Sequence, residues 1–149
     1  MVALGVFDGV HRGHRFILRE VVKKAREIKG VSAAVTFYPH PRSKLSLYSL
    51  PHRLKLIAEL DIDVCIVIKF TPGFARISAE DFIKNILVKK IGARFIYIGK
   101  NFRFGKSARG NWRLLEKFAR DFNYQLKTFN VIKSHGQPVS SSYIRELIT

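Results

Sequence analysis

Short apolar runs alternate with longer amphipathic stretches along the whole chain, and this alternation restricts the fold more than any other feature of the sequence. Most of the apolar runs are nearly continuous, which is typical of strands buried on both faces of a parallel sheet. The alternation therefore predicts an α/β fold with an open, mainly parallel, Rossmann-like sheet and helices on both of its faces. The predicted strands are residues 2–7, 31–37, 63–70, 93–99 and 124–131.

Helix signals fill the segments between these runs. An apolar stripe at helical spacing extends from Leu18 to Ile28, and Gly30 follows it as a stop signal. Pro51 suits a first helical turn, and Ser78 is an N-cap candidate with acidic residues after it. The predicted helices are residues 14–29, residues 51–60, a helix that starts at Ser78, residues 107–122, and a last helix that starts near Ser141. The remaining segments are predicted to be irregular and to gather at the carboxyl ends of the strands, where such folds bind ligands: 38–50, 71–77, 100–106 and 132–140.

Length and cysteine content favour one intracellular domain. The 149 residues suit a single domain over residues 1–149, and no apolar run approaches the roughly 20 residues that a membrane-spanning helix needs. The apolar opening turns polar at Asp8, unlike a signal peptide. Cys65 is the one cysteine and lies in an apolar run, which predicts a buried, inert thiol and a reducing, cytoplasmic location.

The charge balance is strongly positive. The chain has 27 Lys and Arg against 11 Asp and Glu, a formal net charge of +16. Such a charge attracts nucleic acid, an anionic membrane or small phosphorylated ligands, and it does not choose among them. Because the basic residues are spread through every predicted helix, a solvated basic surface is the simplest interpretation.

The segment GVFDGVHRGH (5–14) lies between the first predicted strand and the first predicted helix. Gly9 and Gly13 permit a sharp turn and a close approach of the backbone to a ligand. The start of the following helix presents unsatisfied N–H groups and a positive dipole end, which together favour an anion. His11 and His14 could both donate hydrogen bonds to one phosphate group there. The segment therefore predicts a phosphate site, with plain loop and cap histidines as the alternative.

Two other chemistries fit this segment less well. A zinc site needs three or four ligands, and no further Cys or His stands at suitable spacing. A serine nucleophile would need a strained elbow, which the sequence does not present.

HRGH (11–14) resembles the HxGH signature of the nucleotidyltransferase superfamily, and GVFDGVHRGH resembles the start of the bacterial FAD synthetase adenylyltransferase domain. The HxGH signature alone is compatible with glycerol phosphate, nicotinamide mononucleotide, phosphopantetheine or FMN as the nucleotidyl acceptor. Further stretches resemble the FAD synthetase family in the same order along the chain: TFYPHP (36–41), FTPGFARISAEDFI (70–83), GKNFRFGKSARGN (99–111) and VSSSYIR (139–145). The resemblance covers nearly the whole chain, from residue 4 to residue 147.

The residues of these stretches suit a flavin nucleotide on physical grounds as well. Prolines stiffen TFYPHP, so that Phe37 and Tyr38 could offer rigid surfaces to an isoalloxazine. The family usually has an acidic residue where Tyr38 stands. GKNFRFGKS is not a Walker phosphate loop, because five residues rather than four separate Gly99 from Gly105. The basic residues near it form either a solvated face or an attractor for phosphates: Lys100, Arg103, Lys106, Arg109 and Arg113.

The resemblance implies a role for each matching residue. His11 and His14 are expected to be catalytic, with Mg²⁺ held through the phosphates and by Asn101. The residues expected to bind ATP and its phosphates are Gly5, Phe7, Asp8, Gly9, Gly13, Asn101, Ser141, Ser142 and Arg145. The residues expected to bind the flavin are Phe37, Pro39, His40, Pro41, Phe102, Arg103 and Phe104.

The resemblance implies that the chain makes FAD by transferring AMP from ATP to FMN, with release of pyrophosphate. The expected domain is a single FMN adenylyltransferase domain without a riboflavin kinase domain, so a separate riboflavin kinase is a candidate partner. One alternative is a cytidylyl- or adenylyltransferase acting on another phosphorylated alcohol. A basic nucleic-acid-binding module is the other alternative, and nucleic acid is otherwise expected to bind only through nonspecific charge attraction.

Overall fold

The computed structural model describes residues 1–7, 12–39, 49–130, 133–134 and 137–138. Its centre is a five-stranded sheet in the order β3-β2-β1-β4-β5. Every neighbouring pair in this sheet is parallel, so the predicted Rossmann-like α/β fold is confirmed. The strands are β1 (Val2–Leu4), β2 (Ala33–Tyr38), β3 (Val64–Lys69), β4 (Phe95–Gly99) and β5 (Gln125–Phe129).

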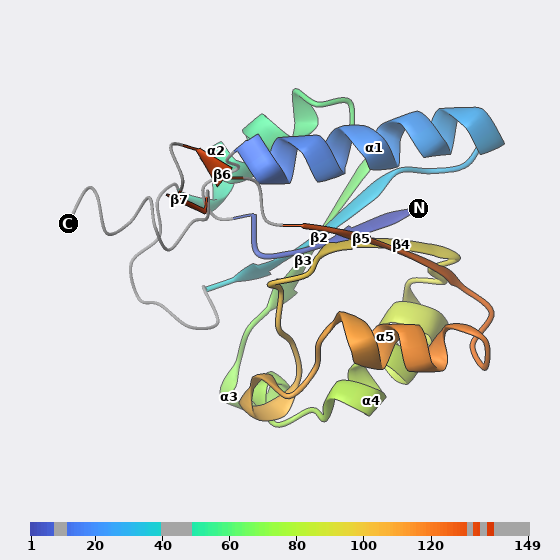
Figure 1. Cartoon of the computed structure of the whole chain (residues 1–149). Helices are drawn as coiled ribbons and strands as arrows, with labels where there is room; N and C mark the ends of the chain where they lie inside the picture. The colour runs from blue at the N-terminus through green and yellow to red at the C-terminus, as the bar shows by residue number, and fades with distance from the viewer. Residues whose placement is uncertain (8–11, 40–48, 131–132, 135–136, 139–149) are drawn as a thin grey trace.

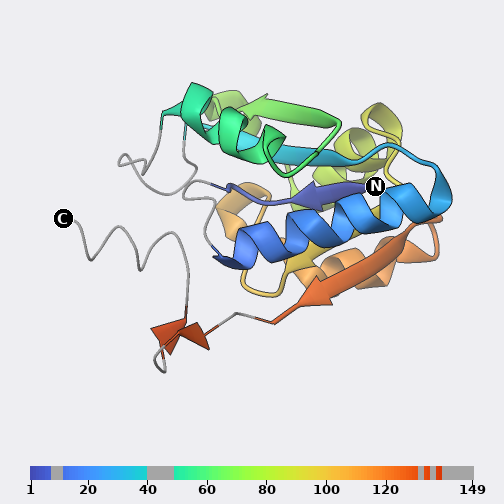
Figure 2. The ribbon, with the colours of Figure 1, turned by 90° about the horizontal axis from the view of Figure 1, so that it is seen from above.

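Helices cover both faces of this sheet, as the alternation of apolar and amphipathic segments predicts (Figure 1). One face carries α1 (Arg12–Ile28) and α2 (Leu50–Ala58), and the view from above shows α1 lying along the sheet (Figure 2). The other face carries α3 (Pro72–Ala75), α4 (Ala79–Asp81) with its π-helical continuation η1 (Phe82–Lys90), and α5 (Trp112–Ala119). A short 3₁₀ turn, η2 (Lys106–Ala108), precedes α5.

The strand side chains alternate between two cores, one on each side of the sheet. Ala3 of β1 packs with the α1 residues Leu18 and Val21, whereas its neighbours Val2 and Leu4 pack on the opposite side. Burying one such Leu or Val stabilises the fold by about 1.5–3 kcal/mol. The second core is the larger one and includes Val35, Phe37, Phe82, Ile83, Leu87, Ile96, Ile98 and Leu115.

Several element boundaries differ from the sequence-based predictions. The helix predicted over 107–122 is α5, which begins only at Trp112 because Asn111 caps it: the Leu114 N–H donates to Asn111 Oδ1 at 3.0 Å. The segment 71–77, predicted to be irregular, contains α3, which Thr71 caps through the Phe74 N–H. Residues 132–140, also predicted to be irregular, contain the antiparallel pair β6 (Lys133–Ser134) and β7 (Gln137–Pro138). The helix predicted near Ser141 lies outside the described residues.

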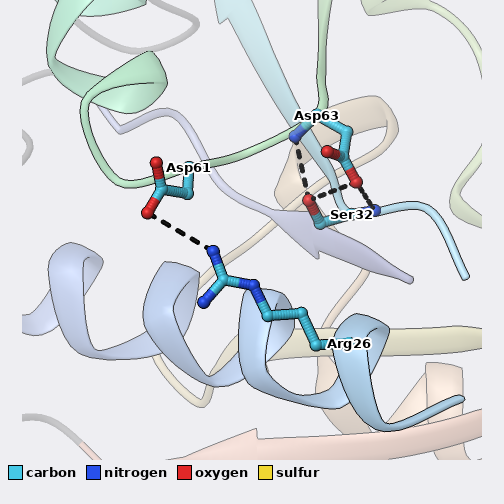
Figure 3. A network of polar contacts seen from close by, with 4 residues as sticks. All are labelled: Arg26, Ser32, Asp61 and Asp63. Carbon is cyan, nitrogen blue, oxygen red and sulfur yellow. Dashed lines mark hydrogen bonds and ion pairs between the residues drawn. The ribbon is translucent and has the colours of Figure 1, made fainter. Parts of the chain in front are cut away.

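A polar network ties the amino ends of β2 and β3 together, at the end of the sheet opposite to the predicted site (Figure 3). Ser32 donates to Asp63 Oδ2 from its N–H at 3.0 Å and from its hydroxyl at 3.1 Å, and the Asp63 N–H donates to Ser32 Oγ at 2.9 Å. These hydrogen bonds lower the pKa of Asp63. Nearby, Arg26 of α1 pairs with Asp61 at 3.4 Å.

Cys65 lies on the edge strand β3 and is half-buried against the α1 core, whereas the sequence predicts a buried thiol. Burial raises the pKa of its thiol, which disfavours the reactive thiolate. Among the helices described, none is long and apolar enough to cross a membrane.

Candidate active site

The sheet order places a switch point between β1 and β4, where chain connections diverge to opposite faces of the sheet. The chain leaves β1 to form α1 on one face, and it leaves β4 to form η2 and α5 on the other face. Open α/β sheets bind ligands beyond the carboxyl ends of the strands at such a point. Three of the predicted site motifs have described residues at this carboxyl edge of the sheet: Gly5–Phe7 after β1, Phe37–Pro39 at the end of β2, and Gly99–Phe104 at the end of β4.

His14 lies in the first turn of α1 and contacts Phe7, which follows the carboxyl end of β1 (called the β1 exit below). Its imidazole meets the ring of Phe7 edge-on, with centroids 5.1 Å apart and planes at 85°. Phe7 is 1% exposed and adopts a positive φ of 54°, so the backbone turns sharply as it leaves β1. His14 is half-buried, and its Nδ1 atom is buried. The same first turn presents backbone N–H groups and no acidic residue, which makes it suitable for an anion.

Gly5 has a packing role at this junction. A Cβ atom at residue 5 would lie 2.9 Å from Cε1 of Phe7, closer than real Cβ contacts. Only glycine therefore lets the Phe7 ring fold back over the end of β1. Because Phe7 in turn contacts His14, the absence of a side chain at Gly5 helps to set the position of the imidazole.

The exit of β4 is similarly compact. A Cβ atom at Gly99 would lie 2.9 Å from Oδ1 of Asn101 and 3.8 Å from Cδ1 of Ile17 in α1. The glycine thus brings the Asn101 amide and the beginning of α1 close to the same strand end. Asn101 is exposed, and the Phe102 N–H donates to the Gly99 carbonyl at 3.1 Å, which closes the turn.

The described residues do not contain a protein-only metal centre, because no three His, Cys, Asp or Glu side chains gather there. The exposed amide of Asn101 offers one hard oxygen ligand. A single neutral oxygen of this kind fits Mg²⁺, which keeps several waters and is commonly bound mainly through substrate phosphates.

The predicted flavin-binding aromatics form one cluster with different degrees of burial. The Phe102 ring is stacked with the rings of Phe37 and Phe104, and its centroid lies 6.1 Å and 6.2 Å from theirs, respectively. Phe37 is 3% exposed and Phe104 is 6% exposed, and both belong to the core together with Phe82. Phe102 is half-buried, and Arg103 and Pro39 are exposed; Pro39 follows a cis peptide bond. Phe37 and Phe104 therefore pack on the core side of the cluster, and Phe102 is the most accessible of the three rings to a ligand.

The loop after β4, which carries Phe102 and Phe104, is held by backbone contacts within the loop and with the α3–α4 segment. Phe104 and Gly110 exchange two backbone hydrogen bonds, at 3.2 and 2.7 Å. Gly105 adopts a φ of +78°, and a Cβ atom there would lie 2.6 Å from Cα of Ala79 at the start of α4. The Lys106 N–H donates to the Ile77 carbonyl at 2.8 Å. The loop is consequently anchored to the α3–α4 segment, which the family motif over residues 70–83 also covers.

The basic residues of this loop remain available for anions. Within the part of the chain that the structure describes, none of Lys100, Arg103, Lys106, Arg109 and Arg113 forms a salt bridge. Lys100 and Arg113 instead lie over the Trp112 ring, at 5.0 and 5.4 Å from its centroid. Cation–π contacts orient these side chains without neutralising their charge. The result is a positive surface beside the exit of β4.

Two buried polar residues near the site are absent from the sequence-based predictions. Arg53 of α2 and Thr36 of β2 are both 0% exposed, and they contact each other between the exits of β1 and β2. One sequence signal could have indicated Arg53: it stands four residues before the buried Ile57, on the same face of the helix. An arginine at an apolar-face position is unusual enough to indicate a polar partner inside the fold.

The structure thus brings together part of the predicted constellation. His14, Gly5, Phe7 and Gly13 lie at the β1–α1 junction, and Asn101 lies at the adjacent β4 exit. The aromatic cluster contains Phe37, Phe102 and Phe104. Pro39 and Arg103 are described and exposed. The remaining predicted site residues lie outside the described residues: Asp8, Gly9, His11, His40, Pro41, Ser141, Ser142 and Arg145.

Comparison with a solved structure supports the fold. A solved crystal structure described as a macrolide-efflux protein from Streptococcus pneumoniae superposes with a TM-score of 0.85 over 99% of this chain and 51% of that chain. At 24% sequence identity, this similarity bears on the fold alone.

Curated relatives named bifunctional riboflavin kinase/FMN adenylyltransferase match over 99% of the chain. The protein from Buchnera aphidicola subsp. Schizaphis graminum is 34% identical, and that from Escherichia coli K12 is 28% identical. The chain spans 50% of the length of each of these relatives. The profile of the FAD synthetase family matches residues 1–143. The chain therefore belongs to the FAD synthetase family.

Proposed function

We propose that this chain is an FMN adenylyltransferase that transfers AMP from ATP to FMN and thereby forms FAD and pyrophosphate. Membership of the FAD synthetase family supports this activity, as do relatives whose names include FMN adenylyltransferase. The placement of His14 in the first turn of α1, against Phe7 at the carboxyl end of β1, is the structural observation that supports it most strongly.

In the proposed reaction, a phosphate oxygen of FMN attacks the α-phosphorus of ATP in line. The new P–O bond joins FMN to AMP, and the bond between the α-phosphorus and its bridging oxygen breaks, so that pyrophosphate leaves with the electron pair. Such a reaction needs positioning and neutralisation of charge more than a protein nucleophile. His14 and the N–H groups of the α1 first turn would donate to the α-phosphate oxygens as charge develops there. His11 is assigned the same role through the family motif.

Other residues are proposed to hold the two ends of the substrates. Ser141, Ser142 and Arg145 would bind the departing pyrophosphate through hydroxyls and a forked guanidinium. Gly5, Phe7, Asp8, Gly9 and Gly13 would shape the phosphate loop. Mg²⁺, when bound, would neutralise phosphate charge, with the Asn101 amide oxygen as its ligand from the protein.

The flavin is proposed to lie against the aromatic cluster. Phe102 supplies the accessible ring surface, and Phe37 and Phe104 keep it in place from the core side. Pro39, His40, Pro41 and Arg103 would complete the flavin site around it. We also infer that residues 1–149 act as one nucleotidyltransferase domain in the cytoplasm, and that FMN reaches it from a riboflavin kinase.

A product assay tests this function directly. The purified chain is incubated with FMN, ATP and Mg²⁺, and the products are separated by chromatography. FAD and pyrophosphate should appear in equal amounts, and replacing ATP with CTP should abolish the flavin product. With riboflavin in place of FMN, neither FMN nor FAD should form. Folded protein that yields no FAD, or that uses CTP with a different phosphorylated alcohol, would contradict the assignment.

A further inference from the structure

A fully buried arginine lies between the exits of β1 and β2. Arg53 projects from α2 and is 0% exposed. Its Nη1 atom donates to the carbonyl of Phe37 at 2.9 Å, to Oγ1 of Thr36 at 3.1 Å and to the carbonyl of Val6 at 3.4 Å. Its guanidinium also lies over the Tyr38 ring, 5.9 Å from the centroid. One charged group therefore contacts two neighbouring strand exits.

Thr36 completes this connection. It is 0% exposed, and its hydroxyl accepts from Arg53 and donates to the Val6 carbonyl. The Val6 carbonyl is thereby held by a side chain of β2 and a side chain of α2 together. Hydrogen bonds from a charged donor are stronger than those between neutral groups, and leaving a buried carbonyl without its partner is costly.

The residues held in this way adjoin both halves of the proposed site. Val6 directly precedes Phe7, which contacts His14. Phe37 stacks near Phe102 and directly precedes Tyr38 and Pro39. A shift of the β1 exit would move the proposed phosphate-binding turn, and a shift of the β2 exit would move the proposed flavin-binding loop.

We propose that Arg53 is a positioning residue that fixes the separation between the carboxyl ends of β1 and β2, which adjoin the proposed phosphate and flavin sites, with Thr36 as its bridge. This inference rests on the proposed function for its effect on catalysis. Because Arg53 is fully buried, it acts through the carboxyl ends of β1 and β2 and not on the substrate. Among the described contacts, one nitrogen of the charged guanidinium, Nη1, donates to three oxygen acceptors.

Hydrogen exchange measures the positioning without reference to activity. In Arg53→Met, which keeps an unbranched side chain but removes the donors, amides in residues 2–7 and 33–39 should exchange faster than in the wild type. Amides of β5, which has no contact with Arg53 among those described, should keep their wild-type rates. If Arg53→Met does not fold, Thr36→Val takes its place, because it removes only the bridging hydroxyl. Unchanged exchange in both segments would overturn the inference, whether or not the chain makes FAD.

Kinetics then test the consequence for the reaction. In Arg53→Met, kcat/KM should fall by about 10- to 100-fold for FMN and for ATP, since small displacements of reacting groups have effects of that order. Arg53→Lys should recover part of this loss, because lysine keeps a charged nitrogen with three donors. The matched control is Arg26→Met, whose exposed ion pair lies near the other end of α1 and whose kcat/KM should stay within about twofold of wild type.

A double mutant separates positioning from general destabilisation. If Arg53 and Thr36 act through one connection, the fall in kcat/KM for Arg53→Met with Thr36→Val should be smaller than the product of the two single effects. Multiplicative effects, or a full loss in Arg53→Lys together with normal exchange, would contradict the shared positioning role. A wild-type chain that forms no FAD would refute the proposed function, while the exchange measurement would still decide whether Arg53 holds the carboxyl ends of β1 and β2 together.

Discussion

The imidazole ring of His14 stands edge-on to the phenyl ring of Phe7, with the two centroids 5.1 Å apart. Phe7 follows β1, and His14 lies in the first turn of α1. Phe7 is buried and its backbone is in the left-handed region, so its ring is a fixed surface against which the imidazole rests. The contact makes the orientation of His14 depend on how Phe7 is packed.

Replacement of Gly5 by alanine tests this dependence. The new Cβ would lie 2.9 Å from the Phe7 ring, which must move and take the His14 contact with it. We expect kcat for FAD formation to fall by about tenfold or more, because misplaced catalytic groups lose much of their effect. Gly73→Ala is the matched control, since its Cβ would meet only Oγ1 of Thr71 at 3.8 Å. Equal kcat values for the two variants would show that Phe7 does not orient His14.

Asn101→Ala should weaken the use of magnesium-bound ATP. The substitution removes the amide oxygen that adjoins Gly99 and the start of α1. We expect the Mg²⁺ concentration at half-maximal rate to rise, and Asn101→Asp to lower it below that of Asn101→Ala, because a carboxylate is a stronger ligand for this ion. The exposed Asn85 of η1 provides the control, Asn85→Ala. An unchanged Mg²⁺ titration for Asn101→Ala would remove this residue from the metal site.

Gly105→Ala should destabilise the fold through the loop after β4. A side chain at its φ of +78° and ψ of 176°, a backbone conformation that is nearly restricted to glycine, costs about 1–3 kcal/mol. The new Cβ would also press on the Ala79 backbone, and overpacking of this kind adds about 1–3 kcal/mol. Gly92→Ala, at a φ of +72° with nothing within 4 Å, should show the cost of a positive φ without a steric contact. Urea unfolding compares the two variants; equal losses in the free energy of unfolding would mean that the Ala79 contact does not constrain the loop.

The Ser32–Asp63 connection predicts a dependence of stability on pH. Its hydrogen bonds lower the pKa of Asp63 in the folded state below the ordinary value of 3.8. The carboxylate therefore stabilises the fold above that value, and this contribution is lost as the pH falls through the lowered pKa.

Asp63→Asn should lower Tm at neutral pH, and its difference from wild type should shrink in acid. Asp61→Asn, which removes only the exposed pair with Arg26, should change Tm little. A Tm difference between wild type and Asp63→Asn that stays constant with pH would contradict this account.

The order of elements follows from patterns that act locally, which is why the sequence predicts it. The apolar stripe that begins at Leu18 is the buried side of α1 as far as Ala25, whereas Ile28 is 43% exposed. Ser78 caps α4 through the Asp81 N–H at 3.1 Å. The position of His14 near the carboxyl end of β1 follows from the same strand–helix alternation. The late start of α5 also has a local cause, because Asn111 caps the helix through the Leu114 N–H, and the sequence-based prediction missed this cap.

The inner parts of the site depend on contacts between distant segments. The motifs predict that Phe37 and Phe104 face a ligand. In the structure both are buried, because Phe82 packs against both rings and Phe74 packs against Phe37. In the sequence, Arg53 is not distinguished from the many surface cations. In the structure it is buried because oxygen acceptors of Val6, Thr36 and Phe37 bind its guanidinium. A sequence motif indicates which chemistry is present, whereas the packing of other segments decides which side chains remain accessible to a substrate.

The turnover of His14→Ala tests the central claim most directly. Single-turnover FAD formation is measured with saturating ATP, and FMN binding is measured separately by the quenching of flavin fluorescence. If His14 neutralises charge at the α-phosphate, the rate should fall by about 100-fold or more, while the Kd for FMN changes little. A folded His14→Ala variant that forms FAD at nearly the wild-type rate would contradict the claim that AMP transfer takes place at the β1–α1 junction.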